Sequence, residues 1–338
     1  MADADYHVIV VGGGPAGLTA GLYTTRLGLD TLVVDRGGGR AAMMQDTHNV
    51  IGVPEEVSGK EFLETATGQL ERYGATVRRG FVESVESTNG DVFRVGLGEE
   101  TLTARRVVLA TGFSDVRPDP PLPRTGKGLH YCLHCDAYMF VDEPVYVMGT
   151  GEAAAHVAMI MLNVTSDVDL LLRGEEPAWS EETDRQLAAH PVTVIESEIA
   201  GMSRDEEGWL AAFEFEDGTE RAYRGGFPMY GSDYNDELVD QLGLERTDAG
   251  TVAVDEHGET SIEGIYAVGD LTPGHNQIPV AMGEGAAAGI AIHKDLRAFP
   301  RSLEAIERDG PVDADAVPAI SERLRSIAVD HVGHAGGD

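Results

Sequence analysis

Cys132 and Cys135 are the only two cysteines of the 338-residue chain, and two residues separate them. A structural disulfide stabilises a protein most when it closes a long loop, and this pair closes almost none. A tetrahedral zinc site would need two further ligands, and His130 and His134 lie close by without the usual spacing of a ligand pair. Because C-x-x-C spacing lowers thiol pKa and permits exchange, we predict a redox pair. Half of a metal site and idle buried thiols are the alternatives.

Asp136 follows the second cysteine directly and puts a carboxylate within reach of the thiols. Thiolate leaving groups need a proton, so we predict that Asp136 gives and takes protons during exchange. The alternative is a solvated acid or a helix cap, since acids are abundant throughout the chain. His134, between the cysteines, could favour a thiolate by its charge, or it could be a spacer that faces solvent.

The N-terminal region has the pattern of a dinucleotide-binding unit. Val8–Val11 is a continuous apolar run, which predicts a buried parallel strand, and it leads into the glycine-rich turn Gly12–Gly17 and a helical stretch. A second apolar run ends in Asp35, where an acid can accept a hydrogen bond from a ribose hydroxyl. We assign Gly12 to the tight turn, Gly14 to the close approach of a pyrophosphate and Gly17 to the contact between helix and strand. Together these features predict a dinucleotide site.

The same pattern begins again after the cysteines. Pro144–Met148 is predicted to be a strand, and Gly149–Ala155 is a second glycine turn that leads into a helix. The next predicted strand, Val168–Leu172, ends at Arg173. We interpret this as an internal repeat and predict a second dinucleotide site, against the alternative of an ordinary strand–helix turn. The sequence therefore predicts an α/β fold with two Rossmann-like, three-layer (ββα) dinucleotide-binding domains.

The charge of the chain is strongly negative. With 25 Lys and Arg against 58 Asp and Glu, the formal net charge is −33. Such a surface repels nucleic acid and anionic membranes, so we expect neither as a partner. It is expected of a halophilic protein, because concentrated salt screens self-repulsion; an acidic face for a cationic partner is the lesser interpretation. No signal segment and no run near 18 apolar residues occur, which predicts a soluble, cytoplasmic protein.

In this order, the pieces resemble the low-molecular-weight thioredoxin reductase family of flavoprotein disulfide reductases, over roughly residues 6–296. Taken singly, only the cysteine motif is specific; taken in order, the motifs are very specific. The resemblance rests on Gly12–Gly17, Asn49, Ala110-Thr111-Gly112, Cys132-x-x-Cys135-Asp136, Gly149–Ala155, and Gly269-Asp270 followed by Asn276-Gln277.

The resemblance implies FAD at the first dinucleotide site and NADPH or NADH at the second. It implies a split FAD-binding domain, residues 1–120 and 250–298, and an inserted NAD(P)-binding domain, 121–249, that carries the cysteines. Residues 299–338 are then an acidic C-terminal tail with one helix. The residues expected around FAD are Gly12, Gly14, Pro15, Ala16, Gly17, Asp35, Arg36, Asn49, Thr111, Gly112, Gly269, Asp270, Gln277 and Ile278. Those expected around the nicotinamide nucleotide are Gly149, Gly151, Glu152, Ala153 and Arg173.

The resemblance also implies roles for the reactive residues. Cys135 would face the flavin and take its electrons, and Cys132 would attack the disulfide of a thioredoxin-like protein substrate. Asp136 would manage the proton. A homodimer is expected from the family, and no metal is needed.

Three departures from the family pattern affect these expectations. A cluster of arginines that binds the 2′-phosphate of NADPH is reduced here to Arg173, followed by Glu175 and Glu176. A single arginine still leans towards NADPH over NADH, whereas the acids oppose a doubly charged phosphate. Asn276 stands where the family usually has an arginine, and Leu133-His134 replaces a small pair between the cysteines.

Two alternatives to a nicotinamide-driven reductase stay open at this point. The first is a protein of the same fold that is fed by reduced ferredoxin, or that runs backwards as a dithiol oxidase using oxygen. The second is a flavin-binding sensor without turnover. A sensor has no need of a thiol pair and a second nucleotide site, which makes it the remoter of the two.

Overall fold

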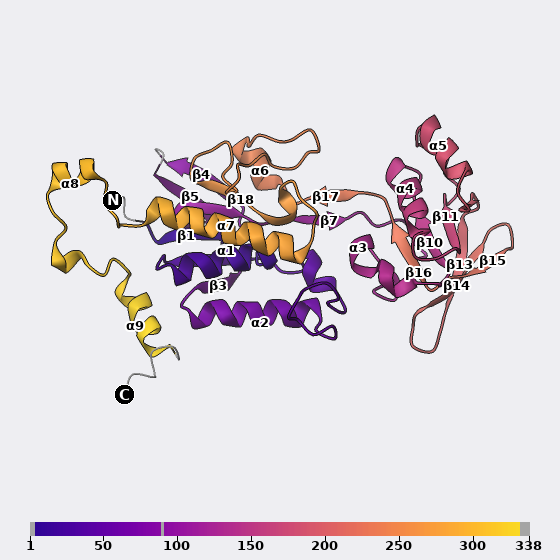
Figure 1. The fold of residues 1–338 in the computed structure, drawn as a ribbon, viewed down its shortest axis with the longest axis horizontal. Coiled ribbons are helices and arrows are strands. Elements are labelled where there is room, and N and C mark those ends of the chain that lie inside the picture. Colours follow the sequence, from indigo (N-terminus) through magenta and orange to yellow (C-terminus); the bar gives the residue numbers. More distant parts are fainter. Residues whose placement is uncertain (1–3, 89–90, 332–338) are drawn as a thin grey trace. The chain divides into compact units, whose positions relative to one another are not determined.

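The chain divides into two compact units, and the computed structural model describes residues 4–88 and 91–331 (Figure 1). Each unit is built from segments that are separate in the sequence. The first unit consists of Met1–Met43, Ser58–Ser114 and Tyr234–Asp338, and the second of Met44–Val57 and Asp115–Asp233. Where the chain passes between them, the short strands β7 (Phe113–Asp115) and β17 (Ser232–Tyr234) pair with each other.

A seven-stranded sheet forms the centre of the first unit (Figure 1). Its order is β3-β2-β1-β6-β5-β4, and β18 pairs with β6 outside this path. The strands are β1 (Tyr6–Val11), β2 (Thr31–Asp35), β3 (Thr76–Arg79), β4 (Ser84–Thr88), β5 (Val92–Leu97), β6 (Glu100–Leu109) and β18 (Ile265–Ala267). β1 lies parallel between β2 and β6, with Val8 opposite Thr31 and Arg106. Both faces of β1 are covered, so Val8, Ile9 and Val10 are fully buried, as the apolar run predicts.

Helices α1 (Pro15–Arg26) and α7 (Ile278–Leu296) pack closely against each other in the first unit (Figure 1). A Cβ on Gly285 of α7 would overlap the carbonyl oxygen of Ala16, so only glycine allows the two backbones to come this close. Gln277 is the N-cap of α7. Further helices of the first unit are α2 (Gly59–Arg72), α6 (Glu237–Leu242) and the short η1 (Arg40–Met43), η3 (Gly269–Leu271) and η4 (Ala314–Ala316).

The second unit has three layers. Its parallel sheet follows the order β12-β11-β10-β16-β9-β8. Alternate residues of β10 face opposite sides: Val145 and Val147 pack with α4, whereas Tyr146 and Met148 pack with Phe213 of a separate antiparallel sheet. The parallel strands are β8 (Arg124–Thr125), β9 (Gly128–Leu129), β10 (Val145–Met148), β11 (Val168–Leu171), β12 (Thr193–Ile195) and β16 (Gly225–Pro228). Its other elements include α4 (Glu152–Met161), α5 (Glu181–Ala188), β13 (Ile199–Arg204), β14 (Leu210–Phe215) and β15 (Glu220–Ala222).

The C-terminal segment contains two α-helices, where the sequence predicted one. α9 (Glu322–Asp330) packs against the rest of the first unit, because Leu324 is buried and Arg323 forms an ion pair with Asp30 at 2.6 Å. The helix that the prediction missed is α8 (Leu303–Asp309), which buries none of its residues. With only seven residues and no buried face, it has no apolar period from which a helix could be predicted.

The predicted α/β fold class is confirmed: the second unit has a parallel sheet covered by helices, and the sheet of the first unit is parallel except where β5 and β4 pair antiparallel at one side. Within residues 4–88 and 91–331, the structure contains no helix with the length and apolar character needed to cross a bilayer.

Candidate active site

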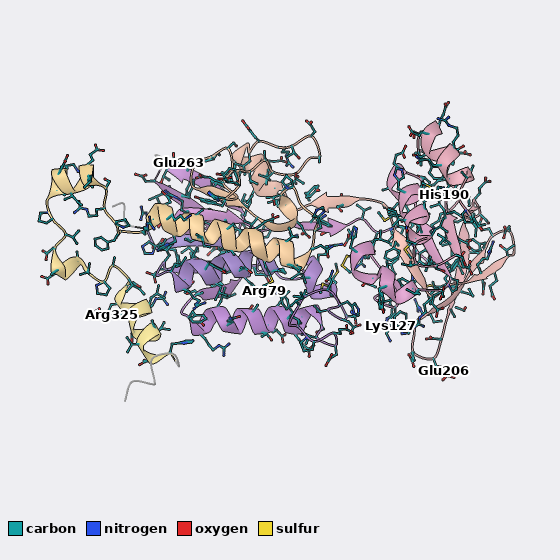
Figure 2. The ribbon with its side chains drawn as sticks, viewed as in Figure 1. Arg79, Lys127, His190, Glu206, Glu263 and Arg325 are labelled. Atoms are coloured by element: carbon teal, nitrogen blue, oxygen red, sulfur yellow. A yellow bond between two sulfur atoms is a disulfide. The ribbon has the colours of Figure 1, made fainter. Side chains whose placement is uncertain are left out.

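Cys132 and Cys135 are joined by a disulfide, with their Cα atoms 5.2 Å apart; disulfides are drawn as yellow bonds in Figure 2. Cys132 precedes α3 (Leu133–Asp136), a single helical turn, and its Sγ accepts a hydrogen bond from the Cys135 N–H at 3.1 Å. The same donor would stabilise a Cys132 thiolate after reduction. The sulfurs are bonded to each other, as expected of a redox pair. The described residues contain no group of three His, Cys, Asp or Glu suited to a metal ion.

Asn49 lies beside this disulfide within the second unit. Its Nδ2 is 3.6 Å from Cys135 Sγ, and its segment, Met44–Val57, belongs to the same unit. The sequence grouped Asn49 with the FAD ligands by resemblance, whereas the contact observed is with sulfur. An amide N–H beside a sulfur stabilises the thiolate form, so this contact would matter most in the reduced pair. Contact of Asn49 with a flavin stays a prediction.

The first glycine turn has the geometry of a dinucleotide cradle. Gly12 has φ +112°, and a Cβ there would overlap the Ala110 carbonyl oxygen; a Cβ on Gly17 would overlap the carbonyl of Gly12. Gly14 differs, because nothing lies within 4 Å of the position its Cβ would take. α1 begins at Pro15 without a side-chain cap, which leaves its first backbone N–H groups for an anion. The pyrophosphate of FAD fits this open, uncapped turn.

Four residues predicted at FAD gather beside this turn: Asp35, Arg36, Thr111 and Gly112. The Gly13 N–H donates to Asp35 Oδ1 at 3.0 Å. Asn235 joins the others, because its Oδ1 accepts from Arg36 at 2.5 Å and its Nδ2 donates to the Thr111 carbonyl at 2.8 Å. Asn235 was not predicted from the sequence, because its partners are 199 and 124 positions away along the chain.

Gly269 and Asp270 lie in η3, against the start of α1. A Cβ on Gly269, which has φ +74°, would come within 2.8 Å of Ala16 Cβ. The Gly269-Asp270 motif therefore contacts the glycine turn Gly12–Gly17. The Gly269 N–H donates to Glu284 Oε2 at 2.7 Å. Burial raises the pKa of Glu284, and the hydrogen bonds from Gly269 and Thr272 act in the opposite direction. Glu284 thus fixes the loop that carries Asp270, a role for which the sequence offers no signal.

The second glycine turn joins β10 to α4 and contains Gly149, Gly151, Glu152 and Ala153. Gly149 has φ +137°, and nothing lies within 4 Å of a Cβ on Gly151, so this turn is also open. The Glu152 carboxylate accepts hydrogen bonds from Thr183 Oγ1 and the Ser180 N–H, which lower its pKa. Glu152 therefore holds the start of α5, a contact that no local pattern around Glu152 indicates.

A family comparison matches both turns and the disulfide at once. Over residues 6–285 the chain matches the family described as pyridine nucleotide-disulphide oxidoreductase. The chain belongs to this family. Membership therefore rests on the segments that form the two glycine turns, the disulfide and the Gly269-Asp270 motif.

Several oxidoreductases of known name are similar to the chain. The thioredoxin reductase of Treponema pallidum (strain Nichols) is 29% identical over 304 residues, which cover 86% of this chain and 96% of that protein. The crystal structure of thioredoxin reductase from Streptococcus pyogenes MGAS5005 has 28% identity and a TM-score of 0.79, covering 88% of this chain and 100% of that one. The NADH dehydrogenase of Bacillus subtilis (strain 168) is 30% identical over 297 residues, 84% of this chain but 57% of that protein. The predicted resemblance to low-molecular-weight thioredoxin reductases is confirmed.

Arg173, predicted to meet a nucleotide, is a buried structural residue in this member of the pyridine nucleotide-disulphide oxidoreductase family. It is 7% exposed, and its Nε donates to Glu198 Oε1 at 2.8 Å. The rest of its guanidinium bonds to the carbonyls of Asp119 and Pro120. A 2′-phosphate needs a guanidinium that is free to reach it, so the contact of Arg173 with a nucleotide, and the preference for NADPH that it implies, stay predictions.

His130 and Asp136 form a pair that the sequence analysis did not predict. His130 Nδ1 lies 2.9 Å from Asp136 Oδ2. The His130 N–H donates to the Gly226 carbonyl at 2.9 Å, which fixes the histidine to β16. His130 was considered only as a possible metal ligand, because nothing in the local pattern indicates that the chain folds back onto Asp136.

An exposed apolar patch follows the disulfide directly and consists of Tyr138, Met139 and Val141. Tyr138 is 87% exposed, whereas its neighbour Phe140 is fully buried in the core of the second unit. The short helix η2 (Ala137–Phe140) therefore presents large apolar side chains to solvent next to a reactive pair. Such a patch is typical of a surface that binds a protein partner.

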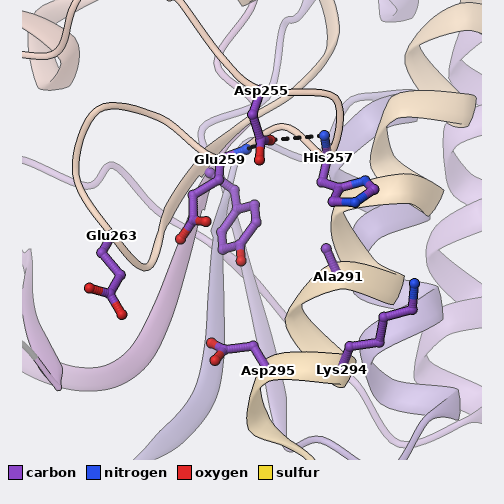
Figure 3. Close-up of a pocket in the computed structure, with 8 residues that line it drawn as sticks. Asp255, His257, Glu259, Glu263, Ala291, Lys294 and Asp295 are labelled. Carbon is purple, nitrogen blue, oxygen red and sulfur yellow. Dashed lines mark hydrogen bonds between the residues drawn. The ribbon is translucent and has the colours of Figure 1, made fainter.

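A pocket of about 460 Å³ in the first unit has an acidic lining (Figure 3). Four carboxylates face one lysine and one histidine across it, so it disfavours an anionic nucleotide. Asp255 holds its rim by accepting hydrogen bonds from the backbones of His257 and Glu259. The lining residues are Asp255, His257, Glu259, Glu263, Tyr266, Ala291, Lys294 and Asp295.

Proposed function

We propose that this chain is an FAD-dependent thioredoxin-disulfide reductase, which passes electrons from a nicotinamide nucleotide to a thioredoxin-like protein. The observation that carries the proposal is the Cys132–Cys135 disulfide, in a chain whose first unit has an open, uncapped glycine turn. The thioredoxin reductases that the chain matches over nearly their whole length support the substrate class.

FAD would be held in the first unit by backbone donors and carboxylates. Gly12–Gly17 would bind the pyrophosphate through N–H groups, and Asp35 would accept from the ribose. Further contacts in the first unit are assigned to Pro15, Ala16, Arg36, Thr111, Gly112, Gly269, Asp270, Gln277 and Ile278. The contact predicted for Asn49, a residue of the second unit, stays a prediction. Bound FAD supplies a carrier that takes up two electrons and can reduce a disulfide.

The two sulfurs would carry out exchange in two steps. The Cys132 thiolate, next to the Cys135 N–H, attacks one sulfur of the partner, and the partner's S–S bond breaks. Cys135 then attacks Cys132, which re-forms the Cys132–Cys135 disulfide and releases the partner's second thiolate. Each leaving thiolate needs a proton, and Asp136 supplies it.

The electron donor is proposed to be a nicotinamide nucleotide, with NADH used at least as well as NADPH. Arg173 is engaged by Glu198, and the exposed Glu175 and Glu176 repel a 2′-phosphate. We therefore expect NADH to bleach the flavin of the anaerobic holoenzyme at least as fast as NADPH does, in a stopped-flow measurement. Bleaching that is more than about tenfold faster with NADPH contradicts this assignment.

Bleaching with neither nucleotide would move the proposal to another donor. The same disulfide chemistry would then be fed by a protein such as ferredoxin, or would run towards oxygen as a dithiol oxidase. A chain that bound flavin but never reduced its disulfide would be a sensor. Cytoplasmic location, a homodimeric state and adaptation to salt stay predictions.

We propose that the apolar patch of Tyr138, Met139 and Val141 docks the protein substrate. Tyr138→Ala should raise KM for a purified thioredoxin about tenfold, because an exposed tyrosine beside a reactive site is typical of a binding hot spot. Reduction of the small disulfide DTNB by the same variant should keep its wild-type rate. Phe81→Ala, which removes an aromatic ring that is 50% exposed in the first unit, is the matched control. If Tyr138→Ala reduced the activity towards thioredoxin and DTNB equally, docking of the protein substrate on this patch would be contradicted.

A further inference from the structure

His130 is a buried residue, and its contacts distinguish the two nitrogens of its ring. The residue is 4% exposed, and its Nε2 has no hydrogen-bond partner within the described part of the chain. Its ring lies among aromatic rings from three elements, with centroids 5.1 Å from Phe140, 6.3 Å from Phe227 and 6.4 Å from Trp209. Nδ1, 2.9 Å from Asp136 Oδ2, is therefore the nitrogen through which this histidine bonds to another side chain.

Among residues 4–88 and 91–331, Asp136 is the acid that forms an ion pair with His130. Arg224 is engaged elsewhere, with its guanidinium 4.1 Å from the Trp209 ring centroid, and His134 on α3 is exposed. Burial raises the pKa of the adjacent Tyr131 hydroxyl, which stays neutral. A proton on Nδ1 that points at a carboxylate gives the better hydrogen bond, so we assign the Nδ1–H tautomer to the neutral ring.

We propose that His130 is the positioning residue for Asp136: it fixes the carboxylate that gives and takes protons beside the cysteine pair. This rests on the proposed reductase function. The Gly226 carbonyl anchors the His130 backbone, His130 Nδ1 anchors Asp136, and the Asp136 N–H donates to the Cys132 carbonyl at 3.1 Å. A rigid strand is thereby connected to the acid that follows Cys135.

The proton balance agrees with the state in the structure. In the reduced protein Cys132 is a thiolate, Cys135 a thiol and Asp136 a carboxylic acid. When Cys132 attacks, the partner's leaving thiolate takes the Asp136 proton. Asp136 then takes the proton of Cys135 as that thiol attacks Cys132, and gives it to the second leaving thiolate. The disulfide has re-formed and Asp136 ends as a carboxylate, the form that accepts a hydrogen bond from His130 Nδ1–H.

The test is a pH profile of the oxidative half-reaction. Photoreduced holoenzyme is mixed with oxidised thioredoxin, and the rate of thioredoxin reduction is followed between about pH 5.5 and 9.5. His130→Leu should lower the rate by about tenfold or more at its optimum, since Asp136 loses its orientation. The pH profile of His130→Leu should also differ in shape from that of the wild type, because the carboxylate has lost the donor that holds it in place. His130→Asn, whose amide can donate from the position of Nδ1, should restore most of the rate and most of the wild-type pH profile.

Three comparisons separate this role from a merely structural one. In an Asp136→Asn background, His130→Leu should have no further effect, because it acts through Asp136. His190→Leu, which removes an exposed histidine (Figure 2), should match the wild type. Flavin content and melting temperature of each holoenzyme monitor folding, and His130→Gln replaces the leucine variant if that one does not fold.

An unchanged pH profile in His130→Leu, or the same loss in the Asp136→Asn background, would overturn the inference. Wild-type enzyme that fails to reduce thioredoxin would instead overturn the proposed function. The two failures are therefore distinguishable within the same experiment.

Discussion

Replacing Cys135 by serine is expected to abolish the reduction of thioredoxin, with kcat falling by a factor on the order of 10³ or more. The remaining Cys132 can form a mixed disulfide with its substrate but has no second sulfur to resolve it. FAD content should stay at the wild-type level, because Cys135 belongs to the second unit and the FAD turn to the first. A coupled assay of insulin reduction through thioredoxin measures the loss.

The two cysteines serve as controls for each other. In the resemblance to thioredoxin reductases, Cys132 attacks and Cys135 resolves. Cys135→Ser should therefore trap thioredoxin in a covalent adduct visible on a non-reducing gel, whereas Cys132→Ser should not. The opposite pattern would exchange the two roles, and undiminished reduction by Cys135→Ser would end the redox assignment.

Gly12→Ala is expected to remove FAD from the protein almost completely. The new Cβ would overlap the Ala110 carbonyl oxygen at a φ of +112°, so the turn must move away from the geometry that presents its N–H groups. Backbone strain of this kind costs about 1–3 kcal/mol. Flavin absorbance per chain after purification, together with the melting temperature, measures both effects.

Two other glycines provide matched substitutions for Gly12→Ala. Gly68→Ala lies in the interior of α2 with open space around its Cβ, so it should be neutral or stabilise by up to about 1 kcal/mol. Gly14→Ala has room and an ordinary φ of −76°, so it should fold normally and weaken only FAD binding. Full FAD content in Gly12→Ala would contradict the cradle geometry.

Local pattern was sufficient to predict the parts of the fold that depend on neighbouring residues. The apolar run Val8–Val11 is a buried strand, the turn after it has the open side that a pyrophosphate needs, and the same arrangement recurs at Gly149. Each depends on strand burial and on the conformational freedom of glycine, and both are properties of a few consecutive residues.

The contacts that surround the site could not be predicted in this way. Asn235, Glu284 and His130 act on motif residues through partners that the fold brings together. Their residue types are also common in solvent-exposed loops and helices. For Arg173, the distant contact concerns a residue that was predicted to bind a ligand. Its position after a strand predicts a phosphate ligand, but its guanidinium bonds to Glu198, 25 positions later. Only the fold decides which charges are free.

The central claim is that electrons reach the Cys132–Cys135 pair from a bound flavin, and an anaerobic reductive titration tests it most directly. Purified holoenzyme is titrated with dithionite, flavin absorbance is followed, and free thiols are counted by alkylation and mass spectrometry. The wild type is predicted to take up about four electrons per chain and to gain two alkylated cysteines, against about two electrons for Cys135→Ser. Uptake of only two electrons by the wild type, with the disulfide intact after the flavin is fully reduced, would contradict the account.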